Sequence, residues 1–232
     1  MNEHENDQDL QYYIRHPSNL PWFELQLEQK YVDHIWKCIE QGKKQCAKSG
    51  LVGNITASYF IDDIDDYFSR NVIYPLVHSY ETNHEKMSEQ VCTTEFHELR
   101  LTSFWVNYQK KYEFNPIHDH SGVYSFVVWL KIPTSSDEEN ENPIAKESNS
   151  PLRSKFSFDY SDTLGNHKRW DYHLDPTYEG RMVFFPSGLR HQVTPFYNSD
   201  ETRVSVSGNI SLYTKNYIKR NEVNQKIWDD AN

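Results

Sequence analysis

The feature that most constrains the fold of this chain is a nearly continuous apolar run from Phe126 to Ile132. A strand in a half-exposed sheet alternates apolar and polar residues, whereas a run without alternation fits a strand covered on both faces. The fold must therefore place a layer on each side of this segment. Immediately before it, the sequence NPIHDHSG carries two imidazoles, His118 and His120, one residue apart.

Several other segments have the alternation or the apolar content of strands. They are Leu20–Leu27, Leu99–Tyr108, Lys155–Asp162, Arg169–Asp175, Arg181–Phe185 and Thr202–Leu212, with a turn at Gly165-Asn166 between the third and the fourth. A total of about eight strands predicts a mainly β fold with flanking α-helices, built on a double-stranded β-helix core of the jelly-roll, cupin-like type.

Two helical patterns precede these strands. Apolar residues recur at spacings of three and four over Tyr31–Gln45 and again over Ile61–Tyr80, where Pro75 is expected to cause a kink. We expect both helices to brace one sheet of the barrel. The acidic cluster in the second pattern, residues 62–66, could bind a cation, but a solvated helix face is the favoured interpretation.

The predicted organisation has three parts. Residues 1–95 form a segment of helices and an edge strand packed on the core, residues 96–214 form the double-stranded β-helix, and residues 215–232 form a polar tail. Within the core, residues 134–154 are acidic and rich in Ser, Asn and Pro. They offer almost nothing to bury, so we expect a flexible surface loop.

Composition limits the partners and the compartment. The 232 residues include 34 acidic and 24 basic ones, giving a net charge of −10, which argues against general affinity for nucleic acid or anionic membranes. Cys38, Cys46 and Cys92 have neither the paired spacing of a zinc site nor the density of a disulfide scaffold. The polar N-terminus is unlike a signal peptide, and no apolar run reaches the roughly 18 residues of a membrane span. We expect a soluble, cytoplasmic protein.

The histidines suggest a metal chelate. Residues i and i+2 of a strand share a face, so His118 and His120 can point at one position while Asp119 points away. His191 follows another apolar strand and a Pro-Ser-Gly turn. Eleven histidines make one such pair unremarkable by chance, but a barrel mouth would bring His191 to the pair.

The last predicted strand has one polar face. Arg203, Ser205, Ser207 and Asn209 alternate with apolar residues. The planar guanidinium of Arg203 suits a carboxylate, and Ser205 can add a hydroxyl to the same oxygens. The alternation alone leaves a solvent-facing strand with an ordinary surface arginine equally open.

The chain resembles the iron(II)- and 2-oxoglutarate-dependent oxygenases, and within them a group common in phages and marine microbes. The resemblance lies in NPIHDHSG followed by SFVVWLKIP, and in EGRMVFFPSGLRHQVTPF followed by ETRVSVSGNI, roughly Leu99 to Leu212. It implies a hydroxylase with Fe(II), 2-oxoglutarate and O2, and leaves open a virus-encoded protein acting in a host cell. Arg203 in an R-x-S pattern would hold the distal carboxylate of 2-oxoglutarate. Tyr108, ten residues before His118, matches a cosubstrate-contacting Tyr or is a packing aromatic.

Two positions depart from the wider family. Most members have Asp or Glu where this chain has His120, so the implied ligands are His118, His120 and His191, with Asp119 as an alternative if the strand bulges. Trp129 stands where hydroxylase relatives often carry a Tyr that bonds 2-oxoglutarate. Its indole can donate one hydrogen bond and accept none.

Three functions therefore stay open at this stage. The resemblance favours a 2-oxoglutarate-dependent hydroxylase acting on a small molecule, a peptide side chain or a modified polymer. The alternatives are a three-His iron dioxygenase that needs no 2-oxo acid, and a non-catalytic cupin-like barrel that binds a ligand. The sequence indicates neither the substrate nor the oligomeric state.

Overall fold

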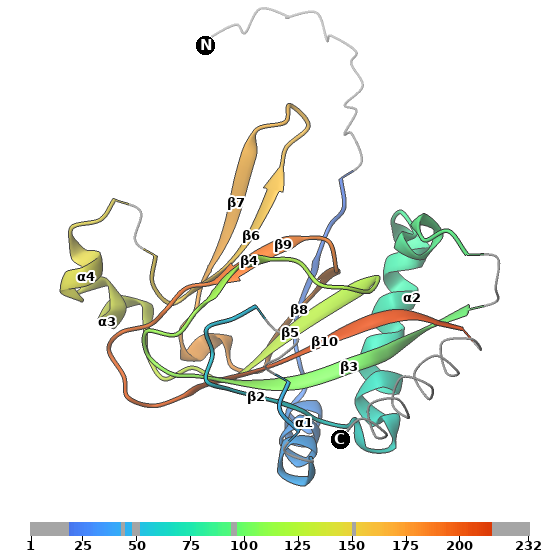
Figure 1. Cartoon of the computed structure of the whole chain (residues 1–232), viewed down its shortest axis with the longest axis horizontal. Helices are drawn as coiled ribbons and strands as arrows, with labels where there is room; N and C mark the ends of the chain where they lie inside the picture. The colour runs from blue at the N-terminus through green and yellow to red at the C-terminus, as the bar shows by residue number, and fades with distance from the viewer. Residues whose placement is uncertain (1–18, 43–44, 48–51, 94–96, 150–151, 215–232) are drawn as a thin grey trace, which may run out of the picture.

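Two antiparallel sheets form the framework of the computed structural model, which describes residues 19–42, 45–47, 52–93, 97–149 and 152–214. The strand order is β1-β8-β5-β10-β3-β2 in the larger sheet and β4-β9-β6-β7 in the smaller one (Figure 1). The strands are β1 (Phe23–Gln26), β2 (Ala57–Phe60), β3 (His97–Gln109), β4 (Asn115–His118), β5 (Tyr124–Lys131), β6 (Lys155–Ser161), β7 (His167–His173), β8 (Arg181–Pro186), β9 (Arg190–Val193) and β10 (Arg203–Thr214). The predicted jelly-roll core is confirmed: β3 to β10 supply four strands to each sheet.

The apolar run that follows the two imidazoles lies in β5, at the centre of the larger sheet between β8 and β10. Its side chains alternate between two cores. Phe126 and Val128 face the side covered by helices, while Val127 and Trp129 face the space between the sheets. Burial on both faces explains why this strand shows no polar alternation.

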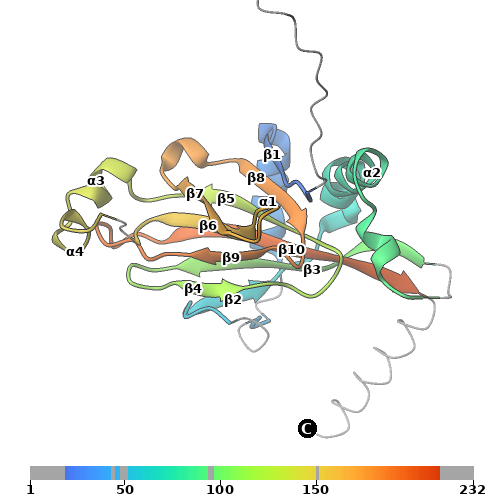
Figure 2. The same ribbon diagram turned by 90° about the horizontal axis from the view of Figure 1, so that it is seen from above.

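The helices cover the outer face of the larger sheet (Figure 2). They are α1 (Gln29–Gln41) and α2 (Tyr74–Asn83), with the short helices η2 (Ile64–Asp66) and η4 (Met87–Gln90) and the π-helical turn η3 (Ser69–Ile73). The aromatic rings of Phe68, Phe104 and Phe126 meet at centroid distances of 5.7 to 6.0 Å in the core beneath them. Both helices brace the sheet as expected.

The kink expected at Pro75 takes the form of a change in hydrogen bonding. Pro75 lies in the first turn of α2 and has no N–H to give to the carbonyl four residues earlier. The π-helical turn η3 occupies the residues directly before α2, and a register change of this kind relieves the missing bond.

The N-terminal segment adds a strand to each edge of the larger sheet. β1 pairs with β8, as expected for an edge strand. β2 pairs with β3 at the opposite edge and was not predicted, because its four residues, Ala57 to Phe60, are too few to show a period.

Both register shifts next to β10 come from an extra residue on its partners. Leu130 is the extra residue on β5, and Thr102 is the extra residue on β3. The shift at Thr102 changes the faces of β3: strict alternation over Leu99–Tyr108 would place Leu99 and Leu101 on one face with Ser103, but they pack against the helical side.

The prediction of a loop without buried groups at residues 134–154 was wrong. The segment contains α3 (Ser136–Asn140), which starts with a capping box between Ser135 and Glu138, and α4 (Pro143–Lys146). Glu139 is fully buried, and its carboxylate accepts hydrogen bonds from the backbone N–H groups of Tyr197 and Asn198 at 3.0 to 3.1 Å. These charge-assisted bonds attach the segment to the chain that leads into β10.

In the part of the chain that the structure describes, no helix is both long and apolar enough to cross a membrane.

Candidate metal and cosubstrate site

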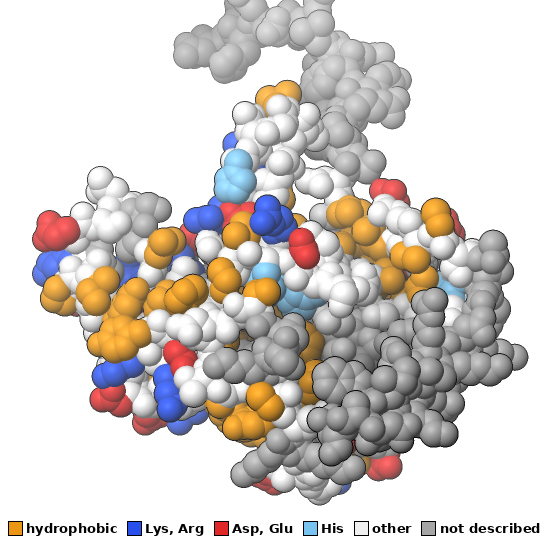
Figure 3. Space-filling view, viewed as in Figure 1, with side chains coloured by type: hydrophobic (Ala, Val, Ile, Leu, Met, Phe, Trp, Pro, Cys, Tyr) orange, Lys and Arg blue, Asp and Glu red, His pale blue; other side chains and the backbone are white. Residues whose placement is uncertain are grey.

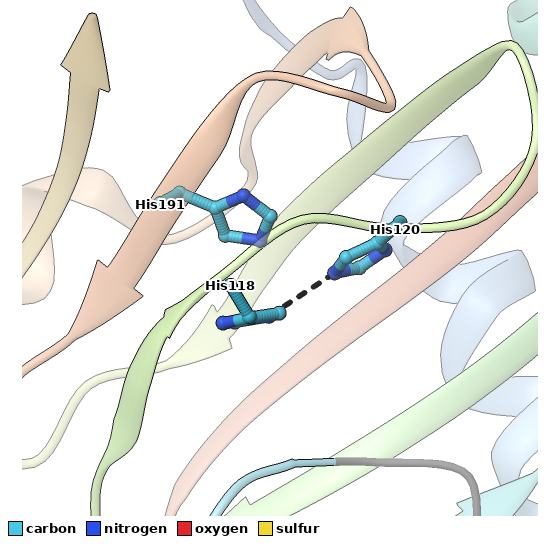
Figure 4. Close-up of side chains that lie close together, drawn as sticks. All are labelled: His118, His120 and His191. Carbon is cyan, nitrogen blue, oxygen red and sulfur yellow. Dashed lines mark hydrogen bonds between the residues drawn. The ribbon is translucent and has the colours of Figure 1, made fainter.

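The three predicted histidines meet between the two sheets (Figure 4). His118 is the last residue of β4, and His191 lies opposite it on β9, as its registered partner. His120 follows the end of β4 and is held by its backbone N–H, which donates to the Ser187 carbonyl at 2.9 Å. His118 and His120 therefore converge because of this loop contact. Strand alternation, which was the expected reason, does not bring them together.

The second ring nitrogen of each histidine fixes its orientation. Nδ1 lies 2.7 Å from the Pro116 carbonyl in His118, 2.8 Å from Asn209 Oδ1 in His120, and 2.9 Å from the Leu189 carbonyl in His191. A carbonyl oxygen can only accept, so each Nδ1 carries the proton. Each Nε2 is then left with a bare lone pair.

These lone pairs face one another. The Nε2 atoms of His118 and His120 are 3.2 Å apart, and the cluster offers one ligand atom from each histidine within 4.8 Å of the others. Two acceptors at such a distance repel unless a proton or a cation lies between them. Three neutral imidazoles on one side of a point are a donor set that suits a divalent transition metal.

Burial keeps these imidazoles neutral. It lowers the pKa of His118, lowers that of His120 to about 4 and lowers that of His191 well below the ordinary value. A metal ligand must be unprotonated, so the environment prepares all three rings to bind at neutral pH. Pale-blue histidine side chains reach the surface near the centre of the face in Figure 3, over β4 and β9.

Asp119, the alternative ligand, lies elsewhere. It is exposed, and it is not part of the group of ligand atoms, although it lines the mouth of the same cavity. The structure therefore brings together the three-imidazole set and leaves the carboxylate outside it.

A polar network behind His120 was not recognised as a support in the sequence. Asn209 Oδ1 accepts from His120 and, at 2.9 Å, from the hydroxyl of Ser125, which lies 2.9 Å from the Ser187 hydroxyl. Ser125 and Ser187 are almost fully buried. A serine inside the apolar strand β5 was the signal that could have indicated this role.

The histidines open into a cavity of about 270 Å³ between the sheets, lined also by Arg203, Ser205 and Trp129. Trp129 is buried and packs its ring edge-on against Phe156 at 5.5 Å. Three of the predicted cosubstrate residues therefore share one cavity with the predicted metal ligands.

Arg203 is buried in this cavity wall with 2% of its surface exposed. Its Nη2 donates to the Ser154 hydroxyl at 2.6 Å, its Nη1 donates to Gln109 Oε1 at 3.4 Å, and its Cζ lies 4.7 Å from the ring centroid of Phe196. Nε has no hydrogen-bond partner among the described residues. Burial lowers the pKa of Arg203 to about 10, so the group stays cationic at neutral pH. The Glu139 carboxylate partly opposes this lowering, but no described residue gives the guanidinium a hydrogen-bonded anion.

Tyr108 does not belong to this cavity, so the expected cosubstrate contact is corrected. It packs against Tyr59 in the core on the helical side, with ring centroids 6.2 Å apart. Neighbouring residues of a strand point to opposite faces, and Asn107 and Gln109 of β3 line the cavity instead. Gln109 was missed, although continuing the alternation from Asn107 would have identified it.

The metal-free protein should lose stability as the pH falls below 6.5. The unfolded chain protonates His120 near 6.5, whereas the folded chain resists protonation down to about 4. The unfolded state therefore binds more protons in this window, and unfolding becomes easier by up to about 1.4 kcal/mol per pH unit for each such histidine. Urea unfolding at pH 5.0, 5.8 and 6.5 with a chelator measures this slope. Equal stability at all three values would contradict it, and His120→Asn should make the slope smaller, because two histidines with lowered pKa values remain.

Solved structures with a similar arrangement include three hydroxylases. The Pseudomonas putida prolyl-4-hydroxylase is 15% identical with a TM-score of 0.49, over 83% of this chain and 92% of that one. The viral collagen prolyl hydroxylase from Paramecium bursaria Chlorella virus-1 is 12% identical with a TM-score of 0.45, over 82% and 94%. A Trichoplax adhaerens prolyl hydroxylase is 11% identical with a TM-score of 0.46, over 84% of each chain. No curated protein matches the sequence.

A family model gives the assignment. Residues 103–209 match the model described as "Putative 2OG-Fe(II) oxygenase". The match begins on β3, ends on β10 and includes the three histidines and Arg203. It confirms the resemblance seen in the sequence. Residues 103–209 of this chain therefore match the 2OG-Fe(II) oxygenase family, the dioxygenases that use iron(II), 2-oxoglutarate and O2.

Proposed function

We propose that this chain binds iron(II) through His118, His120 and His191 and hydroxylates a substrate at the mouth of the cavity. One observation carries the proposal: three bare Nε2 atoms and a buried guanidinium with an unpartnered Nε line the same cavity. The histidines account for a metal, and Arg203 accounts for an anionic ligand beside it. Together they fit the two groups that the family uses.

The side chains of the cavity would bind the metal and the cosubstrate and orient them. The three imidazoles would hold the metal through their Nε2 atoms at the wall of the cavity. When bound, Fe(II) with 2-oxoglutarate and O2 converts a substrate C–H bond to C–OH and releases succinate and CO2. Arg203 would hold the distal carboxylate of the cosubstrate, with the Ser205 hydroxyl beside it on the same face of β10.

The walls of the cavity exclude water. Val127, Phe156 and Phe185 are buried and contribute apolar surface next to the imidazoles. A dry, shaped cavity protects reactive species from side reactions and strengthens the charge interaction at Arg203. Trp129 can give a hydrogen bond or only pack, and its place in the wall supports a packing role.

The substrate follows from the size of the cavity. About 270 Å³ has to hold 2-oxoglutarate and the reacting group, so we propose a small molecule or a peptide side chain that enters from the mouth. The free thiols of Cys38, Cys46 and Cys92 support a reducing, cytoplasmic environment.

Turnover of the cosubstrate tests the proposal. Anaerobically loaded Fe(II) protein given 2-oxoglutarate and O2 should release succinate above the rate of a metal-free control, even without primary substrate. A three-His dioxygenase independent of 2-oxo acids would hold iron and release none. A binding barrel would neither require iron nor consume O2. The family match disfavours both alternatives.

Ser154 should tune the affinity for 2-oxoglutarate. Its hydroxyl accepts from Arg203 and donates to the Leu174 carbonyl at 2.9 Å, although its own backbone is held at φ 42°. Ser154→Ala removes one bond to a charged group, worth about 1.5 kcal/mol, so the KM for 2-oxoglutarate should rise about tenfold with kcat unchanged. Initial-rate kinetics decide it.

The matched control is Ser161→Ala, at the exposed end of β6. It should leave the KM unchanged. Equal KM values in both variants would show that Ser154 does not orient Arg203.

A further inference from the structure

A second group of metal-ligand atoms lies behind the larger sheet, among the helices. His34 and Cys38 are four residues apart on α1 and therefore share a face of the helix. Asp63 precedes η2 and completes the group, whose ligand atoms lie within 4.8 Å of one another. The three residues come from two segments that the fold brings together, which explains why the spacing of the cysteines gave no indication of a site.

The contacts converge on one nitrogen. His34 Nε2 lies 3.0 Å from Asp63 Oδ1 and 3.3 Å from Cys38 Sγ. A Cys-His-Asp nucleophilic triad would use the two ring nitrogens separately, one for the thiol and one for the carboxylate. A single nitrogen offers either one proton or one lone pair, so it cannot fully satisfy both neighbours. A cation between the three atoms would satisfy all of them.

Backbone hydrogen bonds hold the Asp63 carboxylate beside His34 and Cys38. Its Oδ1 accepts from the backbone N–H of Phe68 at 3.0 Å, and its Oδ2 accepts from the backbone N–H of Ser69 at 2.7 Å. The His34 and Asp63 side chains are 11% and 6% exposed, and Cys38 is 1% exposed. Backbone bonds that orient a ligating carboxylate are typical support for a bound metal.

The Cys38 thiol is 1% exposed and lies beside the His34 imidazole, so its sulfur faces the other two ligand atoms and not solvent. A bound metal would deprotonate the thiol directly.

We infer that His34, Cys38 and Asp63 bind a Zn²⁺ ion, with the fourth position open to water. One imidazole nitrogen, one sulfur and one carboxylate oxygen form a donor set for zinc. Tetrahedral zinc would place nitrogen about 3.4 Å from oxygen and about 3.6 Å from sulfur, given usual bond lengths. The present distances of 3.0 and 3.3 Å need only a small outward movement.

A cavity at Asp63 would let the ion and its water ligand reach the site from solvent. Asp63 lines a cavity of about 760 Å³ together with Asp62 and Asp66, on the side of β3 away from the candidate iron site. Neighbouring carboxylates raise the local concentration of cations. The ion would tie α1 to the turn that leads into α2. This site is separate from the proposed function and does not depend on it.

Cobalt spectroscopy distinguishes the two sites, because no sulfur belongs to the three-histidine group. The full chain with His118→Ala and His191→Ala removes competition from the candidate iron site. Titration with Co²⁺ should show one equivalent and a near-ultraviolet thiolate-to-cobalt band, and Zn²⁺ should displace it. Cys38→Ser should abolish the band, whereas Cys46→Ser, at an exposed cysteine, should retain it. Cobalt binding without the band, or a band that survives Cys38→Ser, would overturn the inference.

A second pair of variants guards against misfolding. Asp63→Asn keeps one of the two oxygens that accept from the Phe68 and Ser69 N–H groups and removes the charge. Its Co²⁺ affinity should fall at least tenfold, while an unchanged circular dichroism spectrum shows that the fold survives. Asp62→Asn, at the exposed neighbour, should leave the affinity unchanged. Equal affinity in the two variants would show that Asp63 is not a ligand.

Discussion

Replacing His191 by alanine should remove bound iron and reduce succinate release at least about 100-fold. His191 is 4% exposed, and its ring lies beside those of both His118 and His120, at centroid distances of 4.3 and 4.8 Å. Loss of residues that merely support a metal ligand costs 10- to 100-fold, so loss of a ligand itself should cost more. Iron content after desalting and succinate release measure the two effects.

Asp119→Ala is the matched control for this experiment. Asp119 lies between His118 and His120 in sequence, but its side chain is exposed and outside the ligand group. Iron content should stay at the level of the unsubstituted protein. If Asp119→Ala loses iron while His120→Ala keeps it, the three-imidazole assignment is wrong and the carboxylate is a ligand.

Replacing Arg203 by alanine should lower the affinity for 2-oxoglutarate by about one and a half to three and a half decades. Removing one partner of a desolvated charge pair costs on the order of 2–5 kcal/mol, at about 1.4 kcal/mol per decade. Iron binding should survive, because Arg203 has no contact with the three histidines among its hydrogen bonds. Anaerobic calorimetric titration of the iron-loaded protein measures the affinity.

Two further variants separate charge from geometry. Arg203→Lys restores the charge without the planar fork, so its affinity should be intermediate. Arg70→Ala removes an arginine whose side chain is 68% exposed and should have no effect. An affinity of Arg203→Ala within threefold of the unsubstituted protein would remove the cosubstrate role and favour a dioxygenase independent of 2-oxo acids.

The sequence was most informative where burial differs between the two faces of a strand. The apolar run of β5 predicted burial on both faces of that strand, and the alternation of β10 placed Arg203 and Ser205 on one face, which lines the cavity. The residues of β6 and β7 were also predicted as a hairpin, and Gly165 in the turn has φ 79° as such a turn requires. These features depend on local patterns, which a sequence displays directly.

The errors arose where one residue or one contact decides the structure. The extra residue Thr102 on β3 reverses the faces of Leu99 and Leu101, and nothing in a period-two pattern announces such an insertion. Tyr108 was placed by its distance from His118, but the alternation of β3 directs it to the opposite core. The alternation of side chains along β3 predicts the face of Tyr108 better than its distance in sequence from His118.

The prediction for residues 134–154 was wrong for a different reason. A composition averaged over twenty residues is polar, yet one carboxylate, Glu139, is buried by three backbone contacts, and Ser154 reaches Arg203. Such long-range polar contacts cannot be read from composition, because their partners lie more than forty residues away in sequence. Through Ser154, the segment contacts Arg203 in the wall of the candidate site.

Strand β10 sets the separation between the two halves of the site. Arg203 and Asn209 are six residues apart on the same face, which corresponds to about 20 Å of strand, and both register shifts beside them come from extra residues on β3 and β5. An even interval without insertions keeps Arg203 and Asn209, which supports His120, on the cavity side of the strand. Related sequences should therefore vary in side chains between these positions while accepting no single-residue insertion or deletion, because either change would turn one of the two away from the cavity.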